Sequence, residues 1–244
     1  MDPGLRLSRP TSDATSEEQH RLTRMPYRSL VGSLMYLALG TRPDIAYAVQ
    51  QLCRYLDCYR AIHWEAAKQV VRYLKGTRTL ALTLGGEHMA CLLGHTDSDF
   101  AACTDTRRSV SGYCFSLSLG VVTWSAHQQR IVTLSSCEAE YVAASEASQE
   151  LTWLRTLLAS IGFRQLTTTP LLCDNRGALV LTEDPSFHAR VKHIDTRYHY
   201  VREHVHRHQL QLHYVNTKEN LTNIFTKALP RPVFSHLRTQ LGLS

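Results

Sequence analysis

Two short apolar runs of this sequence each end in an aspartate, and a long helix-forming stretch between them carries a glutamate near its start. The first run, MACLLGHTD, ends at Asp97, and the second, PLLCD, ends at Asp174. SVSGYCFSLS and VVTWSA lie between them, are rich in β-forming residues, and are joined by a Leu-Gly hairpin signal. Helical periodicity then runs over residues 137–161. This alternation restricts the chain to folds that combine a sheet with packed helices.

The order of the elements places the acids at one edge of the sheet. A basic helix around residues 190–207 leads into the strand QLQLHYV, and a last helical stretch carries Asn223, so the order is β-β-β-α-β-α-β-α. If the first three strands form a meander, the long helix starts where the first strand ends, and PLLCD returns parallel to that strand. Asp97 and Asp174 then lie at the carboxyl ends of neighbouring strands, with Glu140 at the same edge. We expect a mixed five-stranded α/β sheet flanked by helices, with Asn223 also near this edge.

Helix phasing indicates which glutamate faces the core. One stripe of the long helix contains Glu140, Ala143, Ala147, Leu151, Leu154 and Leu158. Glu138 lies off this stripe, three residues after Ser135, which is the spacing of a capping box. A buried acid needs a partner, and a divalent metal between clustered carboxylates would supply one. The alternative is that Glu140 caps a helix and that each aspartate, like nearby Asp99, stabilises a turn.

Composition divides the chain into four parts. Residues 1–25 are polar and are expected to be disordered. Residues 26–84 have helical patterns and end in a short expected strand, TLALTL. The sheet domain is expected over residues 85–230, and a helical tail over residues 231–244. The sequence has no apolar run of membrane-spanning length and no hydrophobic signal core, which predicts an intracellular protein of the cytoplasm, the nucleus or both, without a membrane partner.

The chain is basic, with a formal net charge of +6. A basic surface favours a polyanionic partner, and the candidate phosphate contacts are arginines and one lysine in two segments. A solvated basic helix face is the alternative for the second segment. The candidates are Arg107 and Arg108 in the first hairpin turn, and Arg190, Lys192, Arg197, Arg202 and Arg207 before the last strand.

Two other kinds of site are not favoured. His204, His206 and His208 alternate along one segment, but no cysteine or acid completes a compact four-ligand set, so no structural zinc is expected. Ser135, Ser136 and Cys137 lack a base and an orienting group for nucleophilic catalysis. The seven cysteines include no C-x-x-C pair and favour a reducing compartment.

Several blocks of the sequence closely resemble the C-terminal part of copia-type retrotransposon Pol polyproteins. HTDSDFA, DTRRSVSGYCF, TLSSCEAEYVAASEA, LLCDNRGALVL, HARVKHIDTRYHYVRE and NIFTKALP are similar to the ribonuclease H domain of that family, in the same order. PYRSLVGSLMYLALGTRPDIAYAV and VVRYLKGT are similar to the segment that joins it to the reverse transcriptase. The resemblance covers nearly the whole chain and implies a ribonuclease H-like fold preceded by a small helical segment. The polymerase palm is not in this chain, so no polymerase activity is expected.

The resemblance also implies a chemistry. In that family four acids hold two Mg²⁺ ions, replaceable by Mn²⁺, and the enzyme is an endonuclease that cuts the RNA strand of an RNA–DNA hybrid. Those positions fall here on Asp97, Glu140, Asp174 and Asn223, and the last of these is not an acid. Glu219 lies one helical turn earlier and could substitute, although an acid in a first helical turn is the simpler role. The expected function is an attenuated ribonuclease H with a hybrid as substrate and a reverse transcriptase domain as partner in cis or in trans. The alternative is a catalytically silent relic that binds nucleic acid or a protein.

Overall fold

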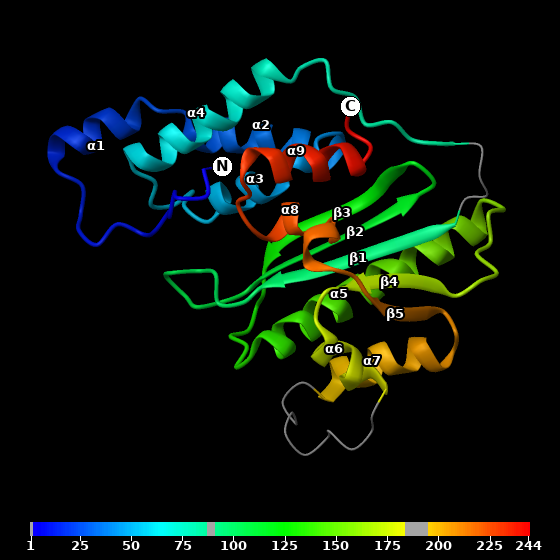
Figure 1. The fold of residues 1–244 in the computed structure, drawn as a ribbon. Coiled ribbons are helices and arrows are strands. Elements are labelled where there is room, and N and C mark those ends of the chain that lie inside the picture. Colours follow the sequence, from blue (N-terminus) through cyan, green and yellow to red (C-terminus); the bar gives the residue numbers. More distant parts are fainter. Residues whose placement is uncertain (1, 87–90, 184–194) are drawn as a thin grey trace.

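A five-stranded sheet forms the centre of the fold (Figure 1). The computed structural model describes residues 2–86, 91–183 and 195–244. The strand order is β3-β2-β1-β4-β5; β1 pairs antiparallel with β2, and β2 with β3, whereas β4 is parallel to both β1 and β5. This mixed sheet with flanking helices confirms the expected fold class, and β1 and β4 are the parallel neighbours that were expected. The bounds are Leu92–Asp99 for β1, Val110–Leu117 for β2, Gly120–Gln128 for β3, Thr169–Cys173 for β4 and Leu210–Tyr214 for β5.

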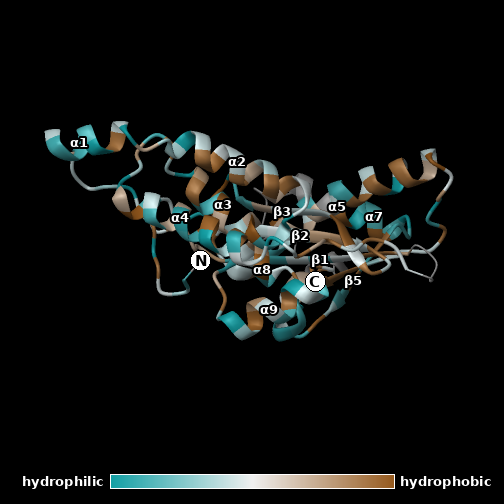
Figure 2. Cartoon of the chain, turned by 90° about the horizontal axis from the view of Figure 1, so that it is seen from above, coloured by the Kyte–Doolittle hydropathy of each residue, from teal (hydrophilic) through white to brown (hydrophobic). Residues whose placement is uncertain are grey.

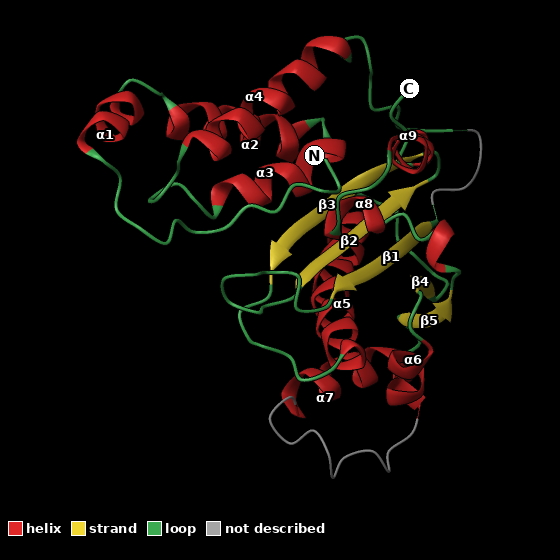
Figure 3. Cartoon of the chain, turned by 60° about the vertical axis from the view of Figure 1, so that its left-hand side comes forward, coloured by secondary structure: helices red, strands yellow, loops and turns green. Residues whose placement is uncertain are grey.

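Helices cover both faces of the sheet (Figures 1 and 3). One face carries α5 (Ser136–Ser160), with α6 (Arg176–Glu183) and α7 (Asp195–His206) beside it. The other face carries α8 (Asn223–Thr226) and α9 (Arg231–Gln240). The connector helices lie on the same side, with α3 against β3; they are α2 (Tyr27–Gly40), α3 (Ala46–Cys53) and α4 (Ala61–Gly76), with a 3₁₀ turn at Pro43–Ile45.

Each face of the sheet has its own hydrophobic core because side chains alternate along every strand. Phe115 and Leu171 point toward α5 and pack with Tyr141 and Leu151. The opposite core contains Cys114, Val121, Phe225, Leu237 and Leu241. A third core joins the connector helices to the N-terminal segment through Leu7, Tyr27, Leu52 and Tyr55.

The capping residues of the long helix α5 determine where it begins and ends, and its apolar stripe determines which face packs against the core. The Ser135 side chain accepts a hydrogen bond from the Glu138 backbone N–H, and Gly162 follows the helix with a φ of 90°. All six stripe residues from Glu140 to Leu158 are buried, as the spacing predicts. Glu138 is buried as well, and its carboxylate accepts from the Leu134 backbone N–H at 2.8 Å. Glu138 therefore stabilises the backbone just before the helix begins, which is the structural role expected for it.

Two segments differ from expectation. Helix α1 (Ser16–Thr23) forms within the stretch expected to be disordered, is predominantly hydrophilic (Figure 2), and is capped by Thr15. The segment is held because Leu7 packs in the connector core and the Tyr59 hydroxyl of the connector donates to the carbonyl of buried Leu22 at 2.9 Å. TLALTL forms no strand; Leu82 makes an isolated bridge with Leu243, and the backbones of Ala81 and Thr83 hydrogen-bond to Ser244 and Gly242 instead of to a strand of the sheet.

The parts of the chain that the structure describes contain no helix with the length and apolar character needed to cross a membrane.

Candidate active site

The sheet edge at the ends of β1 and β4 brings three carboxylates together. Asp97 lies near the end of β1, Asp174 directly follows β4, and Glu140 lies in α5, which starts at the same edge. Asp97 is 2% exposed and Glu140 5% exposed, whereas Asp174 is half-buried. Ligand atoms of Glu140, Asp174 and Cys173 lie within 4.8 Å of one another. Asp97 is not in this set, but it lies close enough to Glu140 and Asp174 for their charges to act on one another.

Burial and mutual repulsion shape the charge of this cluster. Burial, together with the negative charges of Asp97 and Asp174, raises the pKa of Glu140 to about 9. Burial also raises the pKa of Asp97, although the Lys227 ammonium and the Thr226 hydroxyl act in the opposite direction. Without a cation at the cluster, Glu140 holds a proton at neutral pH.

Two residues that follow Asn223 bind Asp97. The Thr226 hydroxyl donates a hydrogen bond to Asp97 Oδ2, and Lys227 Nζ lies 3.5 Å from the same oxygen. Neither contact was predicted. The only sequence signal was that both residues belong to the NIFTKALP block.

Asn223 has an unsatisfied carbonyl. It is the first residue of α8 and is 4% exposed, and its amide Nδ2 donates to the Thr217 carbonyl. Its Oδ1 is buried and has no hydrogen-bond partner among the described residues. An unpaired buried oxygen is costly, so this atom is available to a cation or to a water bound to one.

A glycine opposite Asp97 makes room for α8. Gly112 of β2 pairs with Asp97 in the strand register. A Cβ at Gly112 would come within 2.8 Å of Thr226 Cγ2 and 2.9 Å of Phe225 Cβ. On the other side, Asn220 Nδ2 donates to the Thr96 carbonyl at 2.9 Å. Close approach to β2 and a hydrogen bond to β1 thus fix α8 beside the carboxylates.

The oxygen donors fit a hard divalent cation. Mg²⁺ prefers carboxylate, amide carbonyl and water oxygens, and Asp97, Glu140, Asp174 and Asn223 offer such atoms. Cys173 is near Glu140, but burial raises the pKa of its thiol and keeps it protonated, so it is a poor ligand. Glu219 is exposed in the 3₁₀ turn Thr217–Glu219.

The remaining candidate residues lie in the loop after β1, on α7 or just beyond it, or outside the described residues. Arg107 is exposed and Arg108 half-buried in the loop between β1 and β2, and Arg107 has a φ of 57°. Arg202 is on α7, where Arg207 pairs with Glu203 just beyond the helix end. Arg190 and Lys192 lie outside the described residues, as does the side chain of Arg197. His204 is paired with Gln209 at 2.7 Å, while His206 and His208 are exposed.

Sequence relatives were found over almost the whole chain. It is 41% identical to the retrovirus-related Pol polyprotein from transposon TNT 1-94 of Nicotiana tabacum, over 98% of this chain and 18% of that protein. It is 39% identical to the corresponding polyprotein from transposon RE2 of Arabidopsis thaliana, over 92% of this chain and 16% of that protein. The chain belongs to the retrotransposon Pol polyprotein family. This agrees with the resemblance to the C-terminal part of copia-type Pol, and the chain spans less than a fifth of the length of these relatives. No protein-family model matches the chain.

A further relative is shorter. The chain is 46% identical to the secreted RxLR effector protein 161 of Plasmopara viticola, over 54% of this chain and 94% of that protein.

Solved structures with similar backbones were also found. LC11-RNase H1 in complex with an RNA/DNA hybrid matches 55% of this Pol segment and 93% of that chain, with a TM-score of 0.37 and 12% identity. The foamy viral protease-reverse transcriptase in complex with double-stranded DNA matches 84% of this segment and 42% of that chain, with a TM-score of 0.47 and 12% identity.

Proposed function

We propose that this Pol segment is a ribonuclease H-type endonuclease that hydrolyses the RNA strand of RNA–DNA hybrids. The observation that carries this proposal is the convergence of Asp97, Glu140 and Asp174 at one edge of a mixed sheet, with the orphaned Asn223 carbonyl at the start of α8. Structural acids rarely cluster with so little exposure, because each raises the cost of ionising the others. The basic net charge of the chain supports a nucleic-acid substrate.

The four residues would hold two Mg²⁺ ions, with Mn²⁺ as a substitute. When bound, such a pair activates the attacking water and stabilises the leaving oxygen. Asp97 is oriented for this role by Thr226 and Lys227, which fix its Oδ2. Glu140 must lose its proton when a cation binds, so affinity for the metal rises with pH. Asn223 supplies an oxygen without a charge, and we expect the activity to be attenuated because the cation near it binds more weakly.

A catalytically silent, nucleic-acid-binding protein is the second candidate. Lys227 and Thr226 already satisfy one oxygen of Asp97, and protonation neutralises Glu140, so the cluster is stable without metal. Asn223 also lowers the charge available to attract a cation.

A cleavage assay separates the two candidates. We expect a labelled RNA–DNA hybrid to be cut in the RNA strand with Mg²⁺ or Mn²⁺, and Asp97→Asn to abolish cutting while hybrid binding persists. Thermal unfolding of the variant checks that the fold is intact. Cleavage by Asp97→Asn at the rate of the parent chain would contradict the assignment of the site. Binding without cleavage in the parent chain would favour the silent protein.

The relatives are longer polyproteins, and we propose that a reverse transcriptase domain acts with this segment in cis or in trans. A pull-down with a separately expressed reverse transcriptase domain tests that partnership. Retention of this segment would support it, and no retention would contradict it.

A further inference from the structure

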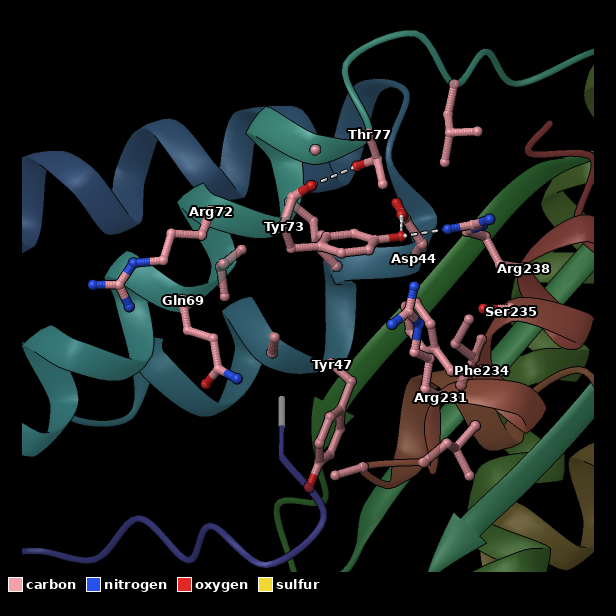
Figure 4. A pocket seen from close by; sticks show the side chains of 18 of the residues that line it. Asp44, Tyr47, Gln69, Arg72, Tyr73, Thr77, Arg231, Phe234, Ser235 and Arg238 are labelled. Carbon is pink, nitrogen blue, oxygen red and sulfur yellow. Dashed lines mark hydrogen bonds between the residues drawn. The ribbon is translucent and has the colours of Figure 1, made fainter.

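A cavity of about 660 Å³ lies between the connector helices and the segment containing α8 and α9 (Figure 4). The connector contributes the stretch from Asp44 to Ala48 and one face of α4 around Tyr73. The other wall comes from Ile224 to Leu229 and from α9. The volume is in the range of roughly 300–1,000 Å³ that small-molecule and cofactor sites occupy. It is too small for a duplex and large enough for a nucleotide unit.

The charged side chains that line this cavity are mostly cationic. Four of them are Arg72, Lys227, Arg231 and Arg238. Among the lining residues that the structure describes, one, Asp44, is acidic. Arg42 neutralises its charge through two hydrogen bonds of 2.9 and 2.7 Å. The Asp44 carboxylate also accepts the Tyr73 hydroxyl at 2.6 Å. Arg72 lies 4.0 Å from Glu65, and Lys227 lies 3.5 Å from Asp97. The excess of positive charge, which suits a phosphate, therefore comes from Arg231 and Arg238.

Two arginines of α9 carry charge that no acid among the described residues pairs with. Arg238 donates to the Tyr73 hydroxyl at 3.2 Å, and its Nε has no partner among the described residues. Arg231 makes no ion pair within the described part of the chain, and Figure 4 shows it extending from α9 toward the connector. The apolar and aromatic lining, including Tyr47, Tyr73 and Phe234, provides surfaces on which a base can stack.

Lys227 joins this cavity to the carboxylates. It lines the cavity, and its Nζ lies 3.5 Å from Asp97 Oδ2. A strand that reaches Asp97 is therefore one side chain away from the cavity. This direct connection between the cavity and Asp97 favours a continuous strand as the ligand over a free nucleotide.

We propose that the cavity binds a nucleotide of a single strand that continues from the hybrid at the carboxylates, through its phosphate and without base specificity. The identity of that strand rests on the proposed function. Arg231 and Arg238 contact the phosphate, and Tyr47 and Phe234 contact the base.

Binding of tailed and blunt hybrids tests this proposal. Fluorescence anisotropy in EDTA compares a blunt RNA–DNA hybrid with hybrids that carry a single-stranded 5′ or 3′ tail. We expect one tailed hybrid to bind more tightly than the blunt one. Arg231→Ala should weaken binding of the tailed hybrid by about tenfold and so remove most of that advantage. It should also reduce the magnitude of the slope of log K against log salt for the tailed hybrid by about 0.7. Arg231→Lys keeps the charge and should retain most of the binding.

Arg164→Ala is the matched control, since Arg164 is an exposed arginine beyond the end of α5. The proposal is overturned if Arg231→Ala and Arg164→Ala both keep the same preference for the tailed hybrid over the blunt one. It is also overturned if a mononucleotide or inorganic phosphate competes for binding while tailed and blunt hybrids bind equally. If the parent chain cleaves hybrids but shows no tail advantage, the cavity proposal fails and the nuclease proposal stands. If nothing is cleaved but Arg231→Ala loses the tail advantage, the nuclease proposal fails and the cavity proposal stands.

Discussion

At the scale of single residues, position 223 determines how much negative charge the carboxylate cluster can offer. The Asn223 amide is held by the Thr217 carbonyl through Nδ2, which leaves Oδ1 as the unpaired atom. A carboxylate at this place would add a charge to a cluster that already raises the pKa of Glu140. On the proposed function, we expect the amide to make the metal-free protein more stable and metal binding weaker.

Asn223→Asp is expected to raise the initial rate of hybrid cleavage by at least about tenfold, because direct ligands matter at least as much as their supporting residues. The same variant should show a larger increase in melting temperature on addition of Mg²⁺ than the parent chain. Asn216→Asp, an exposed substitution in the turn before Asn223, is the control and should change neither quantity. No gain in rate or in metal-induced stability would contradict attenuation by Asn223.

Glu140 makes the metal-free stability depend on pH. Its pKa is raised from 4.5 to about 9 in the folded protein, so the folded state retains a proton that the unfolded state has already released. The free energy of unfolding contributed by this group is therefore fully present below pH 4.5 and is lost as the pH rises toward 9. Chemical denaturation in EDTA at pH 7 and pH 9 should show a smaller decline for Glu140→Gln than for the parent chain.

The control for that comparison is Glu203→Gln, which removes an exposed carboxylate paired with Arg207. It should leave the decline unchanged. The range from pH 7 to 9 also lies above the titration of His95, whose pKa burial lowers to about 4. Equal declines in Glu140→Gln and the parent chain would show that Glu140 ionises normally in the fold.

At the scale of elements, the short helix α8 depends on the flat surface that Gly112 leaves on β2. Four residues cannot form a stable helix alone, so α8 is held by packing and by the Asn220 hydrogen bond to β1. Its position sets where Thr226 and Lys227 meet Asp97.

Gly112→Ala should push α8 away from the sheet, because the new Cβ meets Thr226 and Phe225 at less than 3 Å. We expect a loss of stability of about 1–3 kcal/mol, typical of overpacking, and a loss of cleavage greater than the loss of fold explains. Gly32→Ala in α2 is the control, since nothing lies within 4 Å of a Cβ there, and it should stabilise by about 0.5–1 kcal/mol. Normal stability and activity in Gly112→Ala would show that α8 is not seated in this way.

Local periodicity was enough to predict the elements that carry the acids. The stripe of α5 predicted that Glu140 faces inward, and the strand order predicted that Asp97 and Asp174 lie together. Contacts between distant segments could not be predicted in the same way. Lys227 meets Asp97 only because α8 packs on β2, and the cavity wall pairs α4 with α9.

Capping and burial also explain the N-terminal difference. Charge and polarity favoured disorder for residues 1–25, but α1 is capped by Thr15 and is tied to the connector by Tyr59, which donates to the Leu22 carbonyl, and by Arg60, which lies 3.6 Å from Glu18. The average polarity of a segment does not indicate which of its few apolar residues become buried against another part of the protein.

At the scale of the whole molecule, the connector and the sheet share a core and hydrogen bonds. The Trp124 indole of β3 donates to the Ala38 carbonyl of α2 at 2.8 Å, and α3 packs on the same strand. Arg54 of the connector also pairs with Asp105 in the loop after β1 at 3.3 Å. The two parts are therefore expected to unfold together.

Trp124→Phe should lower the free energy of unfolding by about 1 kcal/mol through the lost hydrogen bond, and fluorescence and circular dichroism should still report one transition. Trp153→Phe on α5, where the side chain is 56% exposed, is the matched control with little effect. Two separated transitions in the parent chain would show that the connector folds independently of the sheet.

The residues that join the connector to the sheet domain are paired with the end of the chain. Ala81 and Ser244 exchange two backbone hydrogen bonds, of 3.0 and 3.2 Å, and the Thr83 N–H donates to the Gly242 carbonyl at 2.8 Å. A swing of the connector that moved residues 81–83 away from the C-terminal residues would have to break these hydrogen bonds. We therefore expect the cavity between α4 and α9 to keep its width when a ligand binds there.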